Sequence, residues 1–206
     1  MKELSYLNFD PIQARQEWQE YKNLLQTHSE LEEAKDVLPF FKQRHHLSLL
    51  IGYYLSYIEE PNCFGHEFDI FGDFKADLIV GDFNKRRYLL IEFENGKSNS
   101  IFKRTQRAVS EWSPRLEKAY SQLTDWLCQL DGEKSTPKFQ EIFGNHDAEF
   151  QAIIIIGKDI TLSDSEQRRL RWRVSKTVID SKKFQIITFE ELLEQCDYYL
   201  TRYYGI

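Results

Sequence analysis

The apolar residues in the first part of the chain recur at helical spacing. Asp10 followed by Pro11 is typical of a helix start, because aspartate caps the first turn and proline is tolerated at its first position. Two apolar stripes follow, formed by Trp18, Tyr21, Leu24 and Leu25 and by Leu47, Leu50, Ile51, Tyr54 and Leu55. Such stripes are typical of amphipathic helices. Residues 10–58 are therefore predicted to be helical, and residues 1–58 to form an all-helical N-terminal segment.

The pattern changes to that of strands after residue 60. The segments 66–71, 74–82 and 88–94 are rich in Phe, Ile, Val, Leu and Tyr and are separated by Gly, Asp and Asn. Apolar runs of this length, bounded by turn residues, predict consecutive strands that form a β-meander. The polar stretch 95–111 matches neither period, so it is assigned no element.

A long amphipathic helix is predicted after Ser113-Pro114. Its apolar positions keep the i, i+3, i+4, i+7 spacing of one helix face: Leu116, Ala119, Tyr120, Leu123, Trp126, Leu127 and Leu130. This spacing is that of a helix that buries one face. Residues 131–149 are rich in turn formers and are predicted to form a loop.

The last part of the chain alternates between strands and helices. Residues 152–156 are one alanine and four isoleucines without polar alternation, as in a strand buried on both faces. Two Ser/Thr-x-x-Glu sequences, at 163–166 and 188–191, have the form of capping boxes and predict helix starts. A short strand, 184–187, lies between those helices. The order of elements predicts an α/β core, residues 60–206, behind the helical segment 1–58.

The composition is that of a folded protein of ordinary size. The chain has 206 residues, of which 15% are aromatic and 29% charged, which argues against disorder. The first residues lack the basic and apolar regions of a signal peptide, and the longest apolar run, 152–156, is too short to cross a bilayer. Cys63, Cys128 and Cys196 are too widely spaced to indicate a disulfide framework or a zinc site. We therefore expect a cytoplasmic protein with reduced thiols and no membrane partner.

Charge is unevenly distributed along the chain, although the net charge is −6. Residues 1–36 hold eight acidic residues against four basic ones, whereas residues 97–118 hold six basic residues and two acidic ones. A second basic run covers residues 168–173. Basic runs occur both on solvated helix faces and along nucleic-acid backbones. The distribution therefore keeps a nucleic-acid partner open without requiring one.

Three acidic residues are predicted to converge on one face of a β-hairpin. If the turn of the hairpin 74–94 is centred on residues 84 and 85, Asp77 lies directly opposite Glu92. The period of two in a strand puts Glu94 on the same face as Glu92. Opposed residues have Cβ atoms about 5 Å apart, and like charges at that separation are destabilising.

Two interpretations of this acidic face remain open. A divalent cation such as Mg²⁺ compensates clustered carboxylates, because it takes oxygen ligands, waters and substrate phosphates. Alternatively, the face is solvated and is neutralised by Lys97 or an arginine, or the register is shifted by one residue. The spacing of the acidic residues alone does not decide between these alternatives.

Around these residues the sequence resembles the PD-(D/E)XK nuclease superfamily and, more narrowly, the nuclease domain of the Shedu anti-phage defence proteins. The family pattern is an Asp in one strand, Glu-x-Lys at the end of the next strand, and then a helix that carries a glutamine. Residues 76–80 and 89–94 match the two strands, and Gln122 matches the glutamine. Later segments are also similar, so that the resemblance spans about residues 60–196.

The resemblance implies a PD-(D/E)XK nuclease-like core, with a mixed central sheet flanked by helices. It also implies an Mg²⁺ or Mn²⁺ site whose ligands are Asp77, Glu92, the carbonyl of Phe93, and Glu94. Glu94 stands where the family usually has lysine, which helps to activate the attacking water. Some members carry Glu-x-Glu and remain active, and Lys97 is a candidate for supplying the missing positive charge.

The implied function is that of a metal-dependent DNA endonuclease or nickase, a hydrolase of anti-phage defence that directs water onto a phosphodiester. The candidate catalytic residues are Asp77, Glu92, Glu94, Gln122 and Lys97. The candidate contacts to phage or plasmid DNA are Lys103, Arg104, Arg107, Arg115 and Lys118. The resemblance further implies a homo-oligomer and no nucleotide cofactor. The alternative is a catalytically degenerate relative that binds nucleic acid or a partner protein without cleavage, in keeping with the acidic net charge.

Overall fold

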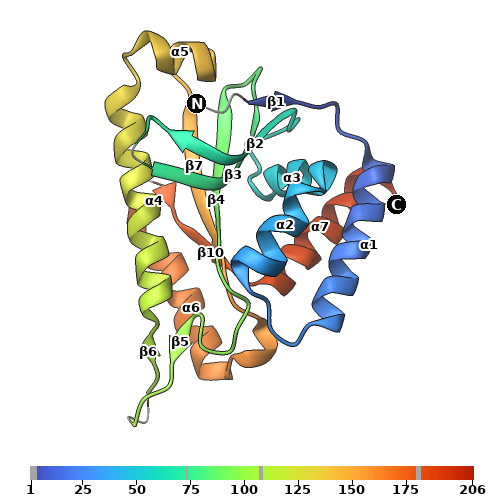
Figure 1. Ribbon diagram of the computed structural model, residues 1–206, viewed down its shortest axis with the longest axis vertical. Helices are drawn as coiled ribbons and strands as arrows, with labels where there is room; N and C mark the ends of the chain where they lie inside the picture. Colours follow the sequence, from blue (N-terminus) through green and yellow to red (C-terminus); the bar gives the residue numbers. More distant parts are fainter. Residues whose placement is uncertain (1–3, 73, 107–108, 180–181) are drawn as a thin grey trace.

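Six strands form one mixed sheet, and helices cover both of its faces (Figure 1). The computed structural model describes residues 4–72, 74–106, 109–179 and 182–206. In spatial order the strands of the sheet are β1 (Ser5–Tyr6), β2 (Cys63–Ile70), β3 (Phe74–Asp82), β4 (Arg87–Phe93), β7 (Glu149–Ile155) and β10 (Gln185–Ile187). Two short ribbons pair β5 (Phe102–Lys103) with β6 (Glu111–Trp112), and β8 (Val178–Ile179) with β9 (Lys182–Lys183). The predicted mixed α/β class is confirmed.

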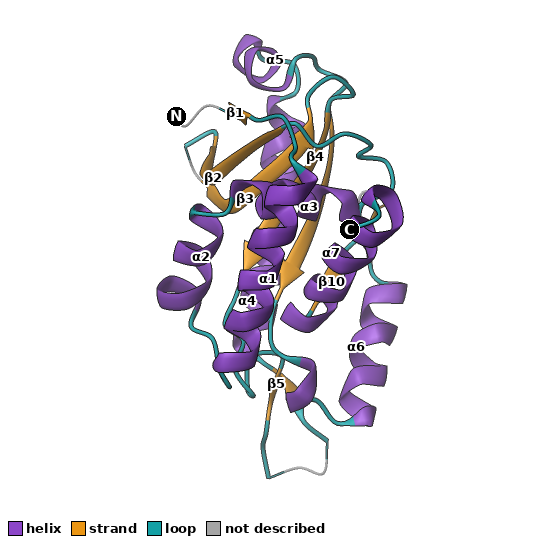
Figure 2. Ribbon diagram, turned by 90° about the vertical axis from the view of Figure 1, so that its right-hand side faces the viewer, coloured by secondary structure: helices purple, strands orange, loops and turns teal. Residues whose placement is uncertain are grey.

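Helices lie on both sides of the sheet. They are α1 (Pro11–Thr27), α2 (Leu38–Lys42), α3 (His45–Ile51), α4 (Pro114–Glu133), α5 (Pro137–Phe143), α6 (Asp164–Lys176) and α7 (Phe189–Tyr204). Single turns of other types are the π-helix Glu33–Val37 and the 3₁₀ turns Gly52–Tyr54 and Asp159–Thr161. α4 covers one face of the sheet, while α1, α3 and α7 cover the other (Figure 1, Figure 2). None of the described helices combines the length and the apolar character that crossing a membrane requires.

β3 and β4 pair in the predicted antiparallel register. Gly81 lies opposite Tyr88, and Leu78 lies opposite Ile91. β4, β7 and β10 run parallel to one another, which makes the sheet mixed. The isoleucines of β7 are buried because helices cover both faces of the sheet, and this explains the missing polar alternation.

Alternate residues of the central strands enter two hydrophobic clusters. Leu78, Val80, Leu89 and Ile91 face α1, α3 and α7, whereas Ile79, Tyr88, Leu90 and Ile154 face α4 and α5. The buried residues of α4 are Leu116, Ala119, Leu123, Trp126 and Leu130, which belong to the predicted stripe. Complete burial of a large apolar side chain contributes roughly 1.5–3 kcal/mol. The clusters therefore fix the strands whose ends carry the acidic residues.

The N-terminal helices share one of these clusters with β3, β4 and α7. Trp18 Nε1 of α1 donates to the carbonyl of Leu193 at 2.9 Å, and the hydroxyl of Tyr21 donates to the carbonyl of Phe189 at 2.8 Å. Both acceptors belong to α7, the last helix of the chain. The first and last helices, α1 and α7, are therefore packed together on one face of the sheet.

A buried lysine closes the C-terminal end of α1. Lys158 is 4% exposed, and its ammonium donates to the carbonyls of Leu25 at 3.0 Å and His28 at 2.7 Å. Carbonyls at the end of a helix lack intrahelical partners and favour a cation. Because Lys158 follows β7, this contact positions α1 relative to the sheet.

The prediction of an all-helical N-terminal segment was wrong at Ser5–Tyr6, which form strand β1. Ser5 pairs with Phe64, and Tyr6 pairs with Cys63. Without this partner the outer edge of β2 would present unpaired backbone groups, which favour unwanted strand pairing.

The predicted loop 131–149 contains the helix α5. The hydroxyl of Thr136 caps it by accepting the N–H of Phe139 at 3.2 Å, and it ends at Gly144, whose φ is 86°. Proline at the first helical position and glycine just after the last one are helix-boundary residues as well as turn formers. The loop prediction was therefore wrong because the same residues mark the two ends of a short helix.

Candidate active site

A pocket of about 770 Å³ opens at the start of β3 and the end of β4, beside the first turns of α4. It brings together most of the side chains selected from the sequence: Asp77, Glu92, Glu94, Lys97, Lys103, Arg115, Lys118 and Gln122. β3 and β4 contribute Asp77 and Glu92 but also Lys75, whereas α4 contributes Arg115 and Lys118 and the β5–β6 hairpin contributes Lys103. The pocket thus has an acidic floor and basic walls.

Asp77 and Glu92 are neighbours on adjacent strands. The β3–β4 pairing ends at Leu78 and Ile91 in the predicted register, and Asp77 and Glu92 are the adjoining residues of the two strands. Oδ2 of Asp77 accepts the N–H of Phe93 at 2.8 Å. Glu92 is only 7% exposed, so the pair is not part of a solvated hairpin face.

Burial opposes the ionisation of this pair. Burial raises the pKa of Asp77 to about 7. The hydrogen bond from the N–H of Phe93 acts to lower this pKa, and the charges of Glu33 and Glu94 act to raise it. Burial and the charge of Asp77 raise the pKa of Glu92 to about 9. Shifts of this kind in a cleft are typical of functional sites. At neutral pH the pair therefore either retains a proton or requires a compensating cation.

Arg115 is the basic partner of Glu94. Glu94 is 4% exposed, and its N–H donates to the carbonyl of Ile155 at 2.9 Å. Its Oε2 lies 2.5 Å from Nη1 of Arg115, which also lies 3.2 Å from Oε2 of Glu33. Burial raises the pKa of Glu94, and Arg115 acts against this shift. Because an unpaired buried carboxylate is costly, the ion pair with Arg115 offsets the charge of Glu94.

Lys97 lies in the pocket wall and pairs with a different acid. Its ammonium lies 2.8 Å from Oε1 of Glu32, and its backbone N–H donates to Oγ of Ser100 at 3.0 Å. The ion pair with Glu94 is therefore made by Arg115 of α4 and not by Lys97, which follows the acidic hairpin.

Glu33 is a pocket residue that the sequence analysis did not select. Leu31 and Gly96 exchange two backbone hydrogen bonds of 3.1 and 2.9 Å, and the N–H of Glu33 donates to Oδ1 of Asn95 at 2.7 Å. The charge of Glu33 helps to raise the pKa of the other three carboxyl groups. These partners are 62 positions apart in the chain, so the only signal in the sequence was the acidic character of residues 1–36.

The first turns of α4 present polar side chains to the pocket. The hydroxyl of Ser113 caps the first turn. Arg115, Lys118 and Gln122 follow at spacings of three and four residues and therefore share one helix face. The charge of Lys118 acts to lower the pKa of Glu92. Gln122 lies beside the two basic residues, as predicted, and all three line the pocket.

Two further predicted DNA contacts, Lys103 and Arg104, belong to the β5–β6 hairpin. Lys103 ends β5 and lines the pocket, and Arg104 follows it and is exposed. Arg107 lies outside the described residues. The hairpin therefore places basic side chains at one border of the pocket.

Asp77 and Glu92 remain as candidate cation ligands, since Oε2 of Glu94 is bound by Arg115. Among the side chains that the structure describes, no group of three His, Cys, Asp or Glu residues is arranged to hold a metal ion. Mg²⁺ often uses one or two carboxylates and completes its shell with waters and substrate phosphates. The two carboxylates, which both line the pocket, fit such a donor set.

Comparison with known proteins places the chain in a family. The model of the family described as "Shedu protein SduA, C-terminal" matches residues 30–193. This range includes all the pocket residues named above, from Glu33 to Gln122. No curated protein matches the chain. Because the matched range covers most of the sequence, the chain belongs to the Shedu family, in the region described as the C-terminal part of SduA.

Proposed function

We propose that this protein is a metal-dependent DNA endonuclease or nickase that acts in anti-phage defence. The observation that carries the proposal is the pair formed by the half-buried Asp77 and the buried Glu92, whose raised pKa values call for a cation, in a pocket that basic side chains of α4 also line. Membership of the Shedu family supports the role in defence. The order β3, β4, α4, β7 supports a PD-(D/E)XK nuclease-like core for the same region.

The proposed mechanism assigns a role to each side of the pocket. Asp77, Glu92 and the carbonyl of Phe93 would hold one Mg²⁺ or Mn²⁺, and the ion would supply Lewis-acid chemistry to the scissile phosphate and to the attacking water. Glu94 orients that water or accepts its proton. Arg115 holds Glu94 through their ion pair and keeps a positive charge beside the phosphate.

The basic walls of the pocket are proposed to hold the DNA backbone. Lys118 and Arg115 extend from α4, and Lys103 and Arg104 extend from the hairpin. Gln122 lies on the same wall and positions a water or a phosphate oxygen. Contacts to phosphate read no sequence and weaken steeply as salt rises. The proposal therefore includes little sequence preference and strong salt dependence.

Plasmid nicking in Mg²⁺ or Mn²⁺ tests the proposal. Glu92→Gln keeps the size of the side chain and removes its charge. Loss of residues that merely orient metal ligands lowers activity roughly 10–100-fold, so loss of a ligand is expected to cost at least as much. Glu141→Gln, at an exposed position of α5, serves as the matched control and is expected to nick like the wild type. Equal nicking by the wild type and Glu92→Gln would refute the assignment.

A nuclease-fold protein that binds nucleic acid or a partner protein without cleavage is the second candidate. The ion pair between Glu94 and Arg115 favours it, because one acid of the site is already neutralised without a metal. This candidate predicts DNA binding that does not respond to Mg²⁺, and no cleavage product. Calorimetric titration with Mn²⁺ separates the two candidates. Saturable uptake that is lost in Asp77→Asn supports the nuclease, and absence of uptake supports the binding protein.

A further inference from the structure

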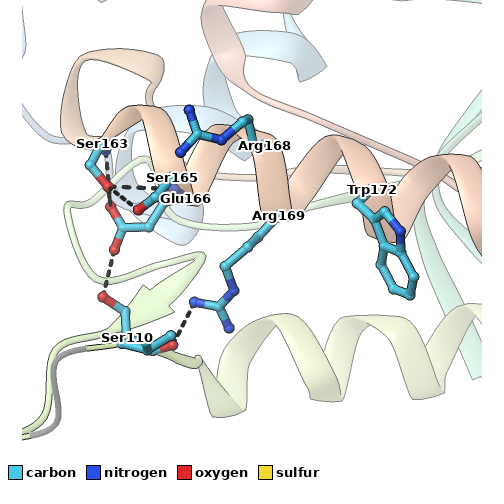
Figure 3. A pocket seen from close by; sticks show the side chains of 8 residues that line it. Ser110, Ser163, Ser165, Glu166, Arg168, Arg169 and Trp172 are labelled. Carbon is cyan, nitrogen blue, oxygen red and sulfur yellow. Dashed lines mark hydrogen bonds between the residues drawn. The ribbon is translucent and has the colours of Figure 1, made fainter.

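A second pocket, of about 480 Å³, lies between the β5–β6 hairpin and α6 (Figure 3). Ser110 lines it from the hairpin, and Arg168, Arg169 and Trp172 line it from α6. None of these residues lines the candidate active site. They include part of the second basic run, which the proposed function leaves without a role.

Two arginines of this run hold the hairpin in place. The guanidinium of Arg169 donates to the carbonyl of Ser110 at 2.7 Å (Figure 3). It also lies 5.1 Å from the ring centre of Trp112. Arg173 lies 2.5 Å from Glu117 of α4 and 4.8 Å from the ring centre of Trp112. The hairpin is therefore fixed to both α6 and α4, and the shape of the second pocket is set by these contacts.

Arg168 and Trp172, which also line the pocket from α6, are exposed and accessible to a ligand. They lie four residues apart on α6, so they are neighbours along the helix surface. The side chain of Trp172 is 66% exposed, whereas Trp18 and Trp126 are 8% and 0% exposed. Arg168 is exposed as well. An exposed flat ring four residues along the helix from an exposed guanidinium suits a ligand that combines flat rings with negative charge.

The hairpin connects this pocket with the candidate active site. Lys103 at one end of the hairpin lines the candidate active site, and Ser110 lines the second pocket. Arg104 follows Lys103, is exposed, and lies close enough to the second pocket for its charge to act on Glu166. Lys103 of the candidate active site is therefore followed by a second basic residue, Arg104, whose charge acts on Glu166 of the second pocket.

Glu166, the acidic residue of the second pocket, accepts hydrogen bonds from two serines. Oε1 of Glu166 accepts the hydroxyl of Ser110 at 2.7 Å, and Oε2 accepts the N–H of Ser163 at 2.9 Å (Figure 3). Burial opposes ionisation, but these hydrogen bonds and the charge of Arg104 lower the pKa of Glu166 below its usual value. The carboxylate thus belongs to the capping box of α6, and Arg168 and Arg104 supply positive charge toward solvent.

We propose that Trp172 and Arg168 form a second nucleic-acid-binding site, which holds single-stranded DNA, with Arg104 as its basic link to the candidate active site. An unpaired base stacks on the indole of Trp172, and the two arginines contact adjacent phosphates. The proposal rests on the proposed nuclease function, because the strand bound here is the continuation of the strand in the candidate active site.

The exposed indole favours a single strand over other anionic ligands. Every base has a π-face, so stacking on an aromatic side chain tolerates any sequence. In a duplex the faces of the bases are covered by their neighbours, and only the phosphates would reach this surface. An acidic peptide would pair with the arginines and gain nothing from the indole.

Binding of a short labelled oligonucleotide to the full chain tests the proposal. All proteins carry Glu92→Gln, so that affinity is measured by fluorescence anisotropy without cleavage. Trp172→Ala is expected to weaken binding of the single strand roughly tenfold or more, and Trp172→Phe by less than about threefold, because phenylalanine retains a stacking face. Tyr198→Ala, which removes a 55% exposed aromatic side chain from α7, is the control and is expected to bind like its parent. The same strand annealed to its complement is expected to respond little to Trp172→Ala.

The emission of Trp172 provides a second readout. Because this indole is exposed, a stacked base is expected to quench its fluorescence, and the quenching should be absent in Trp172→Phe. Unchanged affinity of Trp172→Ala for the single strand would overturn the proposal. Equal weakening of duplex and single-strand binding, or displacement of DNA by oligoglutamate at equal concentration, would overturn it as well.

The two proposals fail in distinguishable ways. Tryptophan-dependent binding of the single strand without any nicking would refute the nuclease function and leave the second site standing. Nicking that requires Glu92, together with wild-type affinity in Trp172→Ala, would refute the second site alone. Circular dichroism of each variant confirms that it is folded, which is expected because Trp172 is exposed and outside both hydrophobic clusters.

Discussion

Replacing Glu92 with glutamine is expected to stabilise the metal-free protein at alkaline pH. Glu92 is 7% exposed and is opposed by Asp77 across the hairpin. Burial, followed by the charges of Asp77 and Glu94, raises its pKa from 4.5 to about 9. Glutamine has nearly the same size and remains neutral, so the variant avoids placing an uncompensated charge in the pocket floor.

The magnitude follows from the linkage between protonation and folding. Between pH 4.5 and 9 the folded protein holds the Glu92 proton and the unfolded chain releases it, so the free energy of unfolding falls as pH rises through this window. From pH 4.5 to pH 8 the loss is at most about 5 kcal/mol, at 1.36 kcal/mol for each pH unit. Because the repulsion between Asp77 and Glu92 disappears when either residue is neutral, we expect a loss of about 2–4 kcal/mol. The variant does not undergo this loss.

Thermal unfolding in the presence of EDTA measures the effect. At pH 8, Glu92→Gln is expected to raise the midpoint of unfolding by about 5–15 °C over the wild type. At pH 5 the wild-type carboxyl is protonated in the fold, so the midpoints should nearly coincide. The exposed control Glu141→Gln should change neither midpoint. A similar rise at both pH values, or no rise at pH 8, would show that Glu92 is not a buried, uncompensated carboxylate.

Three further predictions concern the pocket and the fold. Mn²⁺ should raise the unfolding midpoint of the wild type more at pH 8 than at pH 5, because its ligands must ionise, and calorimetry should show no such rise in Glu92→Gln. Arg115→Met leaves Glu94 unpaired and should lower plasmid nicking roughly 100-fold, a loss typical of removing one electrostatic donor. Lys97→Met should lower nicking much less, and the reverse order of the two variants would assign the charge at the site to Lys97. Lys158→Met leaves two carbonyls at the end of α1 without their donor and should lower the free energy of unfolding by about 2–4 kcal/mol. Urea denaturation checks this value, and an unchanged midpoint would contradict it.

The acidic hairpin was predictable because its determinants are local. The register that follows from a turn centred on residues 84 and 85 is confirmed. The apolar stripe of α4 and the capping boxes that open α6 and α7 are confirmed as well. Each of these patterns involves residues that lie close together in the chain, so backbone periodicity alone determines which side chains meet.

The composition of the pocket walls was less predictable. Glu33 reaches the site through contacts with residues about sixty positions away, and no periodic pattern records such contacts. The choice of Arg115 over Lys97 as the partner of Glu94 depends on how α4 packs against the sheet. Long flexible side chains reach several positions, so the spacing of charged residues leaves their pairing undetermined.

The backbone bridge between Leu31 and Gly96 joins the N-terminal segment to the end of the acidic hairpin, so the two parts are expected to be inherited together. A gene fusion that transferred only residues 60–206 would leave Glu33 behind, together with the helices that shield Leu78, Leu89 and Ile91. The transplanted strands would then present an apolar face to solvent and favour aggregation. A fusion that keeps the candidate active site must therefore include the N-terminal segment, even though the acidic hairpin is encoded within fewer than thirty codons.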